Sequence, residues 1–165
     1  MAVRKIQTID ALKDMVGQSL GVSNWFQITQ DRVDAFAKTT RDDYYIHVDP
    51  ARTARTPLGG TIAHGFLTLS LLPSLGAEAE TTIDLHNNGM KVFNYGLNRV
   101  RFVSPVRVGK RIRMRSKLVG VEDLPSGGHQ ITTEHTVEIE GEQRPAMVAE
   151  YLQRAYPDAS AAGKS

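Results

Sequence analysis

The sequence contains no cysteine, and this absence excludes several kinds of site. Without thiols the chain can form no disulfide framework, no cysteine nucleophile and no thiolate-bound zinc or iron–sulfur centre. Long apolar runs are also missing: the longest nearly apolar stretch, residues 62–75, includes His64 and Pro73 and is too short to cross a bilayer. Near the N-terminus, Arg4 and Lys5 are followed by no apolar segment, so we expect no signal peptide. These absences predict a cytoplasmic protein that makes no membrane contact.

The composition is that of an ordinary folded chain. Of 165 residues, 41% are hydrophobic and 23% are charged, which is typical of a globular domain and not of a disordered one. The chain is long enough to bury most of its apolar surface. No repeat or linker divides it, so we expect a single domain over residues 1–157. Residues 158–165 are rich in Ala, Ser and Gly and are predicted to be a flexible tail.

The net charge of +2 conceals a basic segment between Arg99 and Lys117, which contains no acid. Its eight basic residues are Arg99, Arg101, Arg107, Lys110, Arg111, Arg113, Arg115 and Lys117. One or two of them could meet the phosphates of a ligand, whereas a solvated strand face is the more common explanation for most. Because aromatic residues do not interleave with these bases, we expect no nucleic-acid partner.

The first half of the chain alternates between strand and helix signals. Residues 21–28 read as a strand, and Thr29 is placed to cap a short helix over 30–38. Residues 39–47 have no clean period and are predicted to be a loop, after which Asp49 and Pro50 form a helix-start signal. From Thr61 to about residue 79, apolar residues point in nearly every direction around a helix, which predicts a fully buried helix. Pro73 could kink or split it.

The second half reads as four consecutive strands joined by short turns. Residues 91–98 alternate only loosely, residues 111–118 and 131–139 alternate with a period of two, and residues 146–155 form a last strand. Turn signals occupy residues 124–128 and 141–142. Short turns imply that consecutive strands are antiparallel neighbours. The order predicts an α+β fold, in which a curved antiparallel sheet of about five strands wraps around one long central helix.

Two groups of residues before this helix could carry chemistry. Asp42 and His47 lie five residues apart in a loop, where a carboxylate and an imidazole can share a water molecule for general acid–base catalysis. Taken alone, the pair is more typical of a polar loop. Further on, His64 and Gly65 open the central helix, and the free N–H of Gly65 could stabilise developing negative charge. The glycines of residues 59–65 could equally serve only to let the chain turn into a crowded core.

Other signals of catalysis are weak. His86, His129 and His135 lack metal-ligand spacing, so we expect no metal. The sequence has no phosphate-binding P-loop, no dinucleotide fingerprint and no nucleophile elbow of a serine hydrolase. We therefore expect no cofactor.

Taken together, the segments resemble the MaoC-type dehydratases, the (R)-specific enoyl-CoA hydratase family of the hot-dog fold. Asp42 and His47 match the acid and base of the family pattern at the same spacing, residues 62–67 match its helix opening, and residues 94–109 match its strand block. The similarity extends from about residue 17 to residue 152. Tyr44 and Tyr45 depart from it, because the family pattern has Asn-Pro between its Asp and His.

The resemblance implies a reaction, the reversible syn addition of water to a trans-2-enoyl thioester. Asp42 would take a proton from the water that attacks C3, His47 would orient that water and deliver a proton to C2, and the Gly65 N–H would bind the thioester carbonyl. The expected substrate-binding residues are Tyr44, Tyr45, Ala63, His64 and Arg101.

The resemblance also implies partners and leaves alternatives. The partners would be an acyl-CoA or acyl-carrier-protein thioester and a second copy of the chain in a homodimer. A hot-dog thioesterase is an alternative, although such enzymes usually draw an acid from the central helix and residues 62–75 contain none. A non-catalytic acyl-thioester-binding or interaction domain is another.

Overall fold

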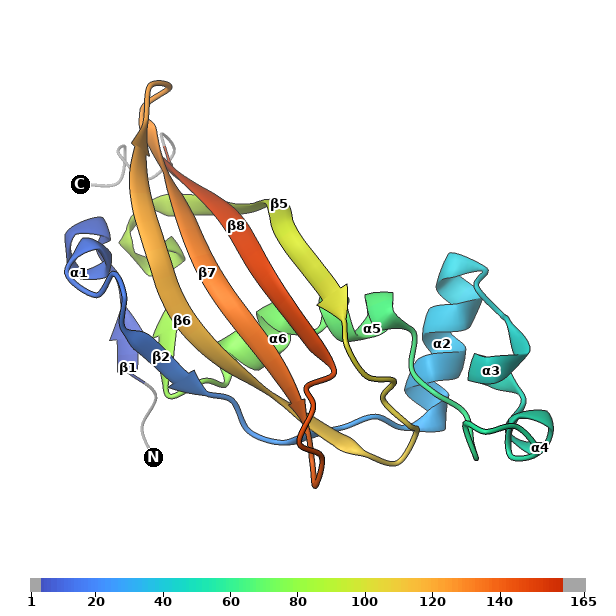
Figure 1. Cartoon of the computed structure of the whole chain (residues 1–165). Helices are drawn as coiled ribbons and strands as arrows, with labels where there is room; N and C mark the ends of the chain where they lie inside the picture. Colours follow the sequence, from blue (N-terminus) through green and yellow to red (C-terminus); the bar gives the residue numbers. More distant parts are fainter. Residues whose placement is uncertain (1–3, 159–165) are drawn as a thin grey trace.

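The computed structural model describes residues 4–158 and consists of a curved antiparallel sheet with two short helices against one face (Figure 1). The helices between residues 30 and 53 lie beyond one end of the sheet. The elements are β1 (Arg4–Ile6), α1 (Ile9–Lys13), β2 (Ser19–Val22), β3 (Phe26–Gln27), α2 (Gln30–Thr40), α3 (Tyr45–Val48), α4 (Pro50–Thr53), α5 (Gly65–Ser70), α6 (Leu72–Ala77), β4 (Thr81–Ile83), η1 (His86–Asn88), β5 (Met90–Phe102), β6 (Arg111–Leu124), β7 (Gly128–Ile139) and β8 (Met147–Pro157). The α+β hot-dog architecture is therefore confirmed.

The strands of the main sheet follow the order β2-β6-β7-β8-β5, and β3 also pairs with β6. The turns at residues 124–128 and 141–142 connect β6, β7 and β8 as antiparallel neighbours, as predicted. The expectation that β5 and β6 are also neighbours is wrong, because β5 pairs with β8 at the edge of the sheet. The connection between β5 and β6 instead bonds to the segment before α5, where Val106 accepts from Ala63 and Ile62 pairs with Arg107.

The predicted central helix is present as two consecutive helices, α5 and α6, which meet at Leu71. Pro73 lies at the start of α6. Since proline has no N–H, it cannot continue the hydrogen-bond ladder of α5, and the helix divides there. The helical region also begins at Gly65 and not at Thr61, because the preceding backbone bonds elsewhere: the N–H of Ile62 donates to Ile46.

Helices α5 and α6 cover the sheet with one side only. Leu67, Leu72 and Leu75 are buried against the sheet, whereas Phe66 is 68% exposed. The expectation of a helix buried on every side is therefore wrong for the single chain. An apolar residue that faces a second copy has the same sequence signature as one that faces the core.

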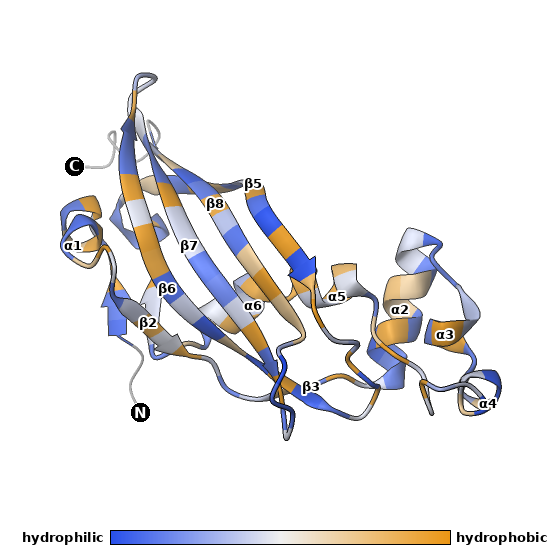
Figure 2. Ribbon diagram, viewed as in Figure 1, coloured by the Kyte–Doolittle hydropathy of each residue, from blue (hydrophilic) through white to orange (hydrophobic). Residues whose placement is uncertain are grey.

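Two apolar clusters fill the space beneath the sheet. The first lies under α5 and α6 and includes Leu72, Leu75, Met114, Val137 and Met147. The second lies at the other end, where α1, β1 and the segment after β4 pack against the sheet. Figure 2 shows the apolar and polar bands that alternate along β6, β7 and β8.

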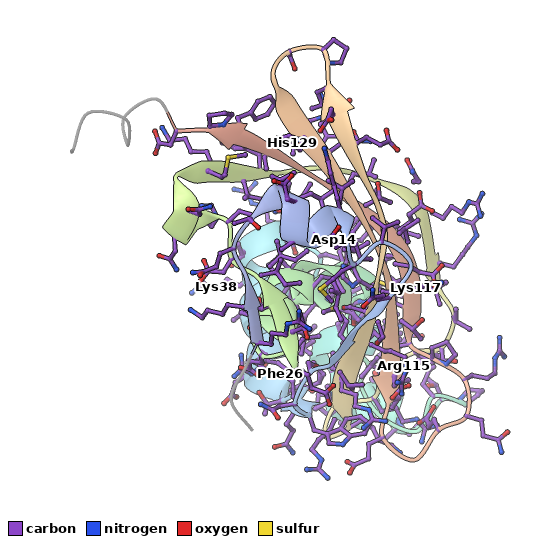
Figure 3. All side chains as sticks on the ribbon, turned by 90° about the vertical axis from the view of Figure 1, so that its left-hand side faces the viewer. Asp14, Phe26, Lys38, Arg115, Lys117 and His129 are labelled. Carbon is purple, nitrogen blue, oxygen red and sulfur yellow. The ribbon has the colours of Figure 1, made fainter. Side chains whose placement is uncertain are left out.

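Three arginines of the basic segment are paired with acids at the neighbouring strand. Arg111 pairs with Glu140, while Arg113 and Arg115 both pair with Glu138. Glu138 lies on β7 and Glu140 directly follows this strand. Because β7 is the antiparallel neighbour of β6, bases and acids on the same face stand opposite one another. Arg115 and Lys117 are labelled along β6 in Figure 3. This part of the segment is a paired strand face.

Several local predictions are confirmed and others need correction. Asp49 caps α4 by accepting from the N–H of Arg52, with Pro50 in the first turn. The strand expected over residues 21–28 is interrupted between β2 and β3, where the Ser23 hydroxyl accepts from the N–H of Met114. Within the predicted loop 39–47, α2 continues to Thr40 and α3 begins at Tyr45.

At the C-terminal end, Asp158 is the one residue of the predicted tail that the structure describes. Asp158 donates its N–H to Gly89 and pairs with Lys91 at 2.9 Å, so the start of the predicted tail is held against the sheet. Residues 159–165 of that tail lie outside the described residues. Among residues 4–158, no helix has the length and apolar character needed to span a bilayer.

Candidate active site

The candidate active site is formed by three segments: the end of α2 with the loop that follows it, helix α3, and the turn into α5. Arg41 ends α2 in a left-handed conformation with φ of 61°, which turns the chain so that Asp42 leaves the helix axis. Helix α3 begins three residues later and carries His47. The sequence spacing between Asp42 and His47 therefore spans a helix end and the start of a new helix.

His47 is buried and has a fixed orientation. Its Nδ1 lies 2.7 Å from the carbonyl oxygen of Ile62. Because a carbonyl only accepts, Nδ1 carries the proton and donates, which leaves Nε2 as the nitrogen that can exchange a proton. The residue is 8% exposed, so almost all of it is enclosed by the protein.

His64 lies immediately before α5 and is more deeply buried, at 2% exposure. Its Nε2 lies 2.8 Å from the backbone carbonyl oxygen of Asp42, so Nε2 donates and holds the loop of the acid. Its other nitrogen, Nδ1, is buried with no hydrogen-bond partner among residues 4–158. The ring stacks on that of His47.

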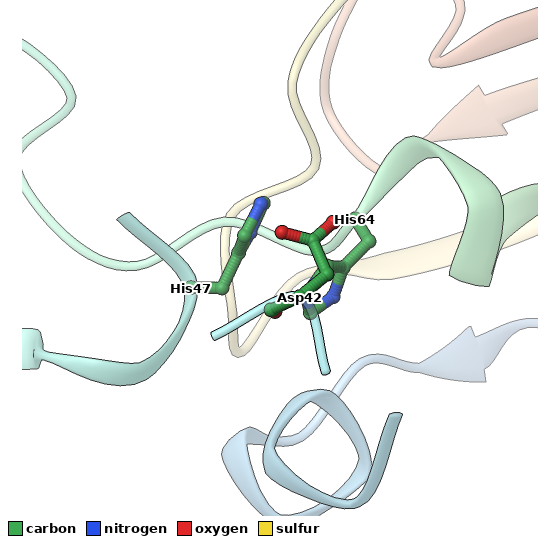
Figure 4. A group of neighbouring side chains, drawn as sticks. All are labelled: Asp42, His47 and His64. Carbon is green, nitrogen blue, oxygen red and sulfur yellow. The ribbon is translucent and has the colours of Figure 1, made fainter. Parts of the chain in front are cut away.

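The three side chains meet although they come from different segments (Figure 4). One donor atom from each of Asp42, His47 and His64 lies within 4.8 Å of the other two, and the Asp42 side chain is exposed. Such a set could contact a divalent metal ion. However, the two imidazole planes are only 23° apart, so their lone pairs lie in nearly parallel planes and a shared ion would require one ring to turn.

A cleft of about 310 Å³ opens beside these residues. It is lined by His47, Ile62, Ala63, Gly65, Thr68, Phe102, Val103, Ser104, Pro105, Val106 and Ala146. A Cβ at Gly65 would lie 2.9 Å from the Phe102 ring, so close approach explains the glycine there. As the first residue of α5, Gly65 has an N–H that no carbonyl of the helix accepts.

Gln30 is a site residue that sequence reasoning missed. From the first turn of α2, its Nε2 donates to the His47 carbonyl oxygen at 2.7 Å, and its Oε1 accepts from the Thr61 hydroxyl at 2.6 Å. It thus ties α2 to both flanks of the site. No sequence motif signals this role, because the three residues meet only through the tertiary fold.

The expected substrate-binding residues lie at different places. Ala63 lines the cleft. Tyr44 is 59% exposed and stands edge-on against Tyr45, over whose ring Arg52 lies at 3.8 Å. Arg101 lies on β5, where its guanidinium donates to the carbonyl of Val100. The structure thus places His47, Ala63 and Gly65 at the cleft and groups Asp42 and His64 with His47, while Tyr44, Tyr45 and Arg101 do not line the cleft.

Comparisons with known proteins show to which family the chain belongs. Residues 11–140 match the family model described as a MaoC like domain. The chain is 48% identical over 153 residues to the 3-hydroxyacyl-thioester dehydratase Z of Mycobacterium tuberculosis, and the match covers 92% of this chain and 98% of that protein.

Two solved structures illustrate the likeness in fold. The monoamine oxidase regulatory protein from Archaeoglobus fulgius superposes with a TM-score of 0.74 at 20% identity, covering 93% of this chain and 97% of that one. The (R)-hydratase from A. caviae involved in PHA biosynthesis has a TM-score of 0.65 at 25% identity, covering 84% of this chain and 94% of that one. Relatives named as dehydratase and hydratase make the chain a hydro-lyase. With the family model matching most of its length, the chain belongs to the MaoC-like dehydratase family.

Proposed function

We propose that this protein is an (R)-specific enoyl-CoA hydratase, or equally a 3-hydroxyacyl-CoA dehydratase, since the reaction is reversible. The observation that carries the proposal is that Asp42 meets His47, and that His47 and Gly65 line the same cleft. A carboxylate, an imidazole and a backbone donor are the three groups that hydration of a conjugated thioester requires.

The two side chains divide the proton transfers. The step starts with Asp42 ionised and with the His47 ring carrying a proton on each nitrogen. Asp42 takes a proton from the water as the water oxygen bonds to C3, and Nε2 of His47 delivers its proton to C2 on the same face. The Nδ1 of His47 keeps its hydrogen bond to Ile62 whether the ring is neutral or charged, so the ring holds its orientation through the reaction. The proton then passes from Asp42 back to His47 through their shared water site, which restores the starting state.

The N–H of Gly65 binds the thioester oxygen as it gains enolate charge. A fixed backbone donor at such a position contributes about 10²–10³ in rate in other enzymes. The lack of a side chain at Gly65 lets the Phe102 ring pack against the start of α5, and both residues line the cleft. Ala63 lines the cleft and can contact the substrate there, whereas His64 supports the site by holding the Asp42 loop.

The thioester carrier, CoA or acyl carrier protein, would lie outside the cleft. Tyr44, Tyr45 and Arg101 are placed to meet it there and not at the reacting carbons, because Tyr44 and Arg101 are exposed and none of the three lines the cleft. Nothing in the proposed chemistry calls for a metal or a further cofactor, since both proton transfers and the charge stabilisation have a named group.

We further propose that the protein acts as a homodimer joined along β5. This strand forms an edge of the sheet and exposes Phe93, Tyr95 and Leu97, while Phe66 is exposed on α5 nearby. An uncovered edge with apolar side chains invites pairing with another strand. A second copy related by a two-fold axis would cover β5 in both copies at once.

The test is hydration of crotonyl-CoA, followed by loss of the conjugated thioester absorbance, in wild type and in Asp42→Asn and His47→Gln. Both substitutions are expected to lower kcat by about 10²–10⁴. Asp43→Asn is the matched control, because Asp43 is an adjacent, exposed acid outside the group, and it should retain activity. Chiral analysis of the product should give the (R) alcohol.

Two outcomes would overturn the proposal. Release of free CoA without hydration would assign a thioesterase, although helices α5 and α6 contain no acidic residue. Absence of both reactions in a folded wild-type protein would assign a binding domain.

A further inference from the structure

A band of polar side chains crosses the inner face of the sheet between the two apolar clusters. Ser116 on β6, Thr133 and His135 on β7, and Tyr151 on β8 are all at most 9% exposed. Their strand neighbours on the same face are apolar: Met114 and Leu118 flank Ser116, and Ile131 and Val137 flank the pair on β7. The band therefore interrupts what would otherwise be one continuous core.

The band is uncharged and already hydrogen-bonded. His135 lies 2.8 Å from the Ser116 hydroxyl through Nδ1 and 2.9 Å from the Thr133 hydroxyl through Nε2. Burial lowers the pKa of His135 to about 4, so its ring is neutral near pH 7. A neutral imidazole supplies one donor and one acceptor, and each hydroxyl bonded to it keeps a further position for another partner. The band thus offers spare hydroxyl donors and acceptors without charge.

These residues face a cavity of about 180 Å³ between the sheet and α6. Its lining is Leu20, Leu72, Pro73, Gly76, Ala77, Ala79, Thr81, Thr82, Ile83, Met114, Ser116, Thr133, His135, Tyr151 and Gln153. None of these residues is acidic, and none is a lysine or an arginine. The cavity therefore suits a group that is polar but uncharged, attached to an apolar chain that contacts the Leu and Met side chains.

The cavity lies in line with the candidate active site along the helices. The residues of α6 that line the cavity are Leu72, Pro73, Gly76 and Ala77, and at the rise of a helix they lie about 10–18 Å along the chain from Gly65. A groove beside β5 shares Leu72, Pro73 and Tyr151 with the cavity, so the two hollows adjoin. A medium-length acyl chain whose thioester lies at Gly65 would have its far end at this distance.

We infer that this cavity receives the far end of the acyl chain and favours chains that carry a hydroxyl or carbonyl group there. The inference rests on the proposed function and names its substrate class: thioesters with an oxygen-bearing tail in place of a plain hydrocarbon tail. The spare hydroxyl positions of Ser116 and Thr133 bond the tail oxygen, while the apolar wall contacts the methylene groups before it.

The experiment compares the binding of two saturated thioesters, decanoyl-CoA and ω-hydroxydecanoyl-CoA, to the full-length protein by titration calorimetry. Neither is turned over by hydration, so binding is measured separately from catalysis. We expect ω-hydroxydecanoyl-CoA to bind about 10-fold more tightly, which corresponds to one net hydrogen bond. Equal binding of the two, or tighter binding of decanoyl-CoA, would overturn the inference.

A matched pair of variants locates the effect. Thr133→Val removes a hydroxyl from the cavity, and we expect the preference to fall to less than about 3-fold. Thr132→Val makes the same change on the adjacent residue of β7, which is also buried but does not line the cavity, and it should keep the wild-type preference. Loss of the preference in both variants alike would show that the cavity is not its source.

A third variant guards against misfolding. Ser116→Ala combined with Thr133→Val and His135→Leu replaces the whole hydrogen-bonded set by apolar side chains, and such joint replacement can be neutral for stability. It should fold and prefer decanoyl-CoA. Hydration of crotonyl-CoA, whose chain is too short to reach the cavity, is measured in parallel. Absence of that activity with a retained tail preference would overturn the proposed function alone, whereas activity without a preference would overturn only the present inference.

Discussion

The imidazole rings of His47 and His64 are stacked, with their centroids 3.7 Å apart. His47 bonds to the backbone of Ile62, and His64 bonds to the backbone of Asp42. The segment that ends in His64 therefore contacts both proposed acid–base residues immediately before the chain reaches Gly65. The distances between the Asp42 carboxylate, the His47 ring and the Gly65 N–H therefore depend on this one segment.

The first prediction concerns His64, which we expect to act by positioning the Asp42 loop. His64→Ala should lower kcat for crotonyl-CoA by about 10–100-fold with a small change in KM, because a misplaced catalytic group slows the chemical step more than it weakens binding. His64→Asn, which can restore a donor to the Asp42 carbonyl, should recover part of the loss. His86→Ala is the control, since that histidine is exposed and distant in η1. A change confined to KM would contradict the role.

The second prediction concerns the space at Gly65. In Gly65→Ala the new Cβ would meet the Phe102 ring at 2.9 Å, so the helix start or the ring must shift. We expect a loss of about 1–3 kcal/mol of stability in urea unfolding, the usual cost of overpacking, together with reduced kcat. Adding Phe102→Leu should restore part of the stability. Gly120→Ala introduces the same group where no atom lies within 4 Å and should change little.

The third prediction is a pH dependence of stability that arises from His135. Burial lowers the pKa of this side chain from 6.5 to about 4 in the folded protein. As the pH falls from 6.5 to 4, the unfolded chain therefore takes up a proton that the folded chain does not, and the folded state loses up to roughly 3 kcal/mol. Well above pH 6.5 the ring is neutral in both the folded and the unfolded state, so His135 no longer makes the stability depend on pH.

The measurement is the free energy of unfolding in urea between pH 4 and pH 8, with the triple variant that lacks His135 for comparison. The variant should show a flatter profile across the acid half of this range. Glu138 has a lowered pKa in the folded state, where the nearby guanidinium groups of Arg113 and Arg115 outweigh the opposing effect of partial burial. Its contribution is present above the unfolded pKa and is lost only at lower pH. Parallel profiles for the two proteins would exclude His135 as the source.

The fourth prediction concerns assembly along β5. Light scattering at micromolar concentration should give the mass of a dimer for wild type. A double variant, Tyr95→Lys with Leu97→Lys, should give a monomer, because two charges would be buried without partners at the joined edge. Val16→Lys with Val119→Lys adds the same charges at exposed apolar positions outside β5 and should remain dimeric. A monomeric wild type would refute the arrangement.

The accuracy of the sequence predictions depended on whether a signal was local. Asp49 with Pro50 specifies a helix start through its own side chain and ring, and the structure shows that cap. The period-two strands β6 and β7 were equally readable, because each residue's face follows from its neighbours. By contrast, the bond between His64 and Asp42 joins residues brought together by tertiary packing, and nothing in either residue's surroundings in the sequence indicates it.

The same distinction explains the errors. The position of β5 was wrong because a short connection favours a hairpin, whereas the contact between Val106 and Ala63 directs this one elsewhere. The exposed side of α5 was also missed, since an apolar residue in the sequence does not indicate whether it packs against the core or faces the outside of the chain. Both errors concern long-range pairing, which hydrophobic patterning does not encode.

The pairing of β5 with β8 has a consequence for the order in which the protein folds. Strands β6, β7 and β8 are joined by tight turns and can assemble from local contacts, whereas Asn94 must find Gln153 across more than fifty residues of chain. Closing so long a loop is slow compared with forming a hairpin. The loop that supports the turn into α5 follows directly from β5, so we expect the cleft to take shape only when this last strand docks. Removal of β8 from the end of the chain would therefore eliminate the site without deleting any residue proposed to take part in catalysis.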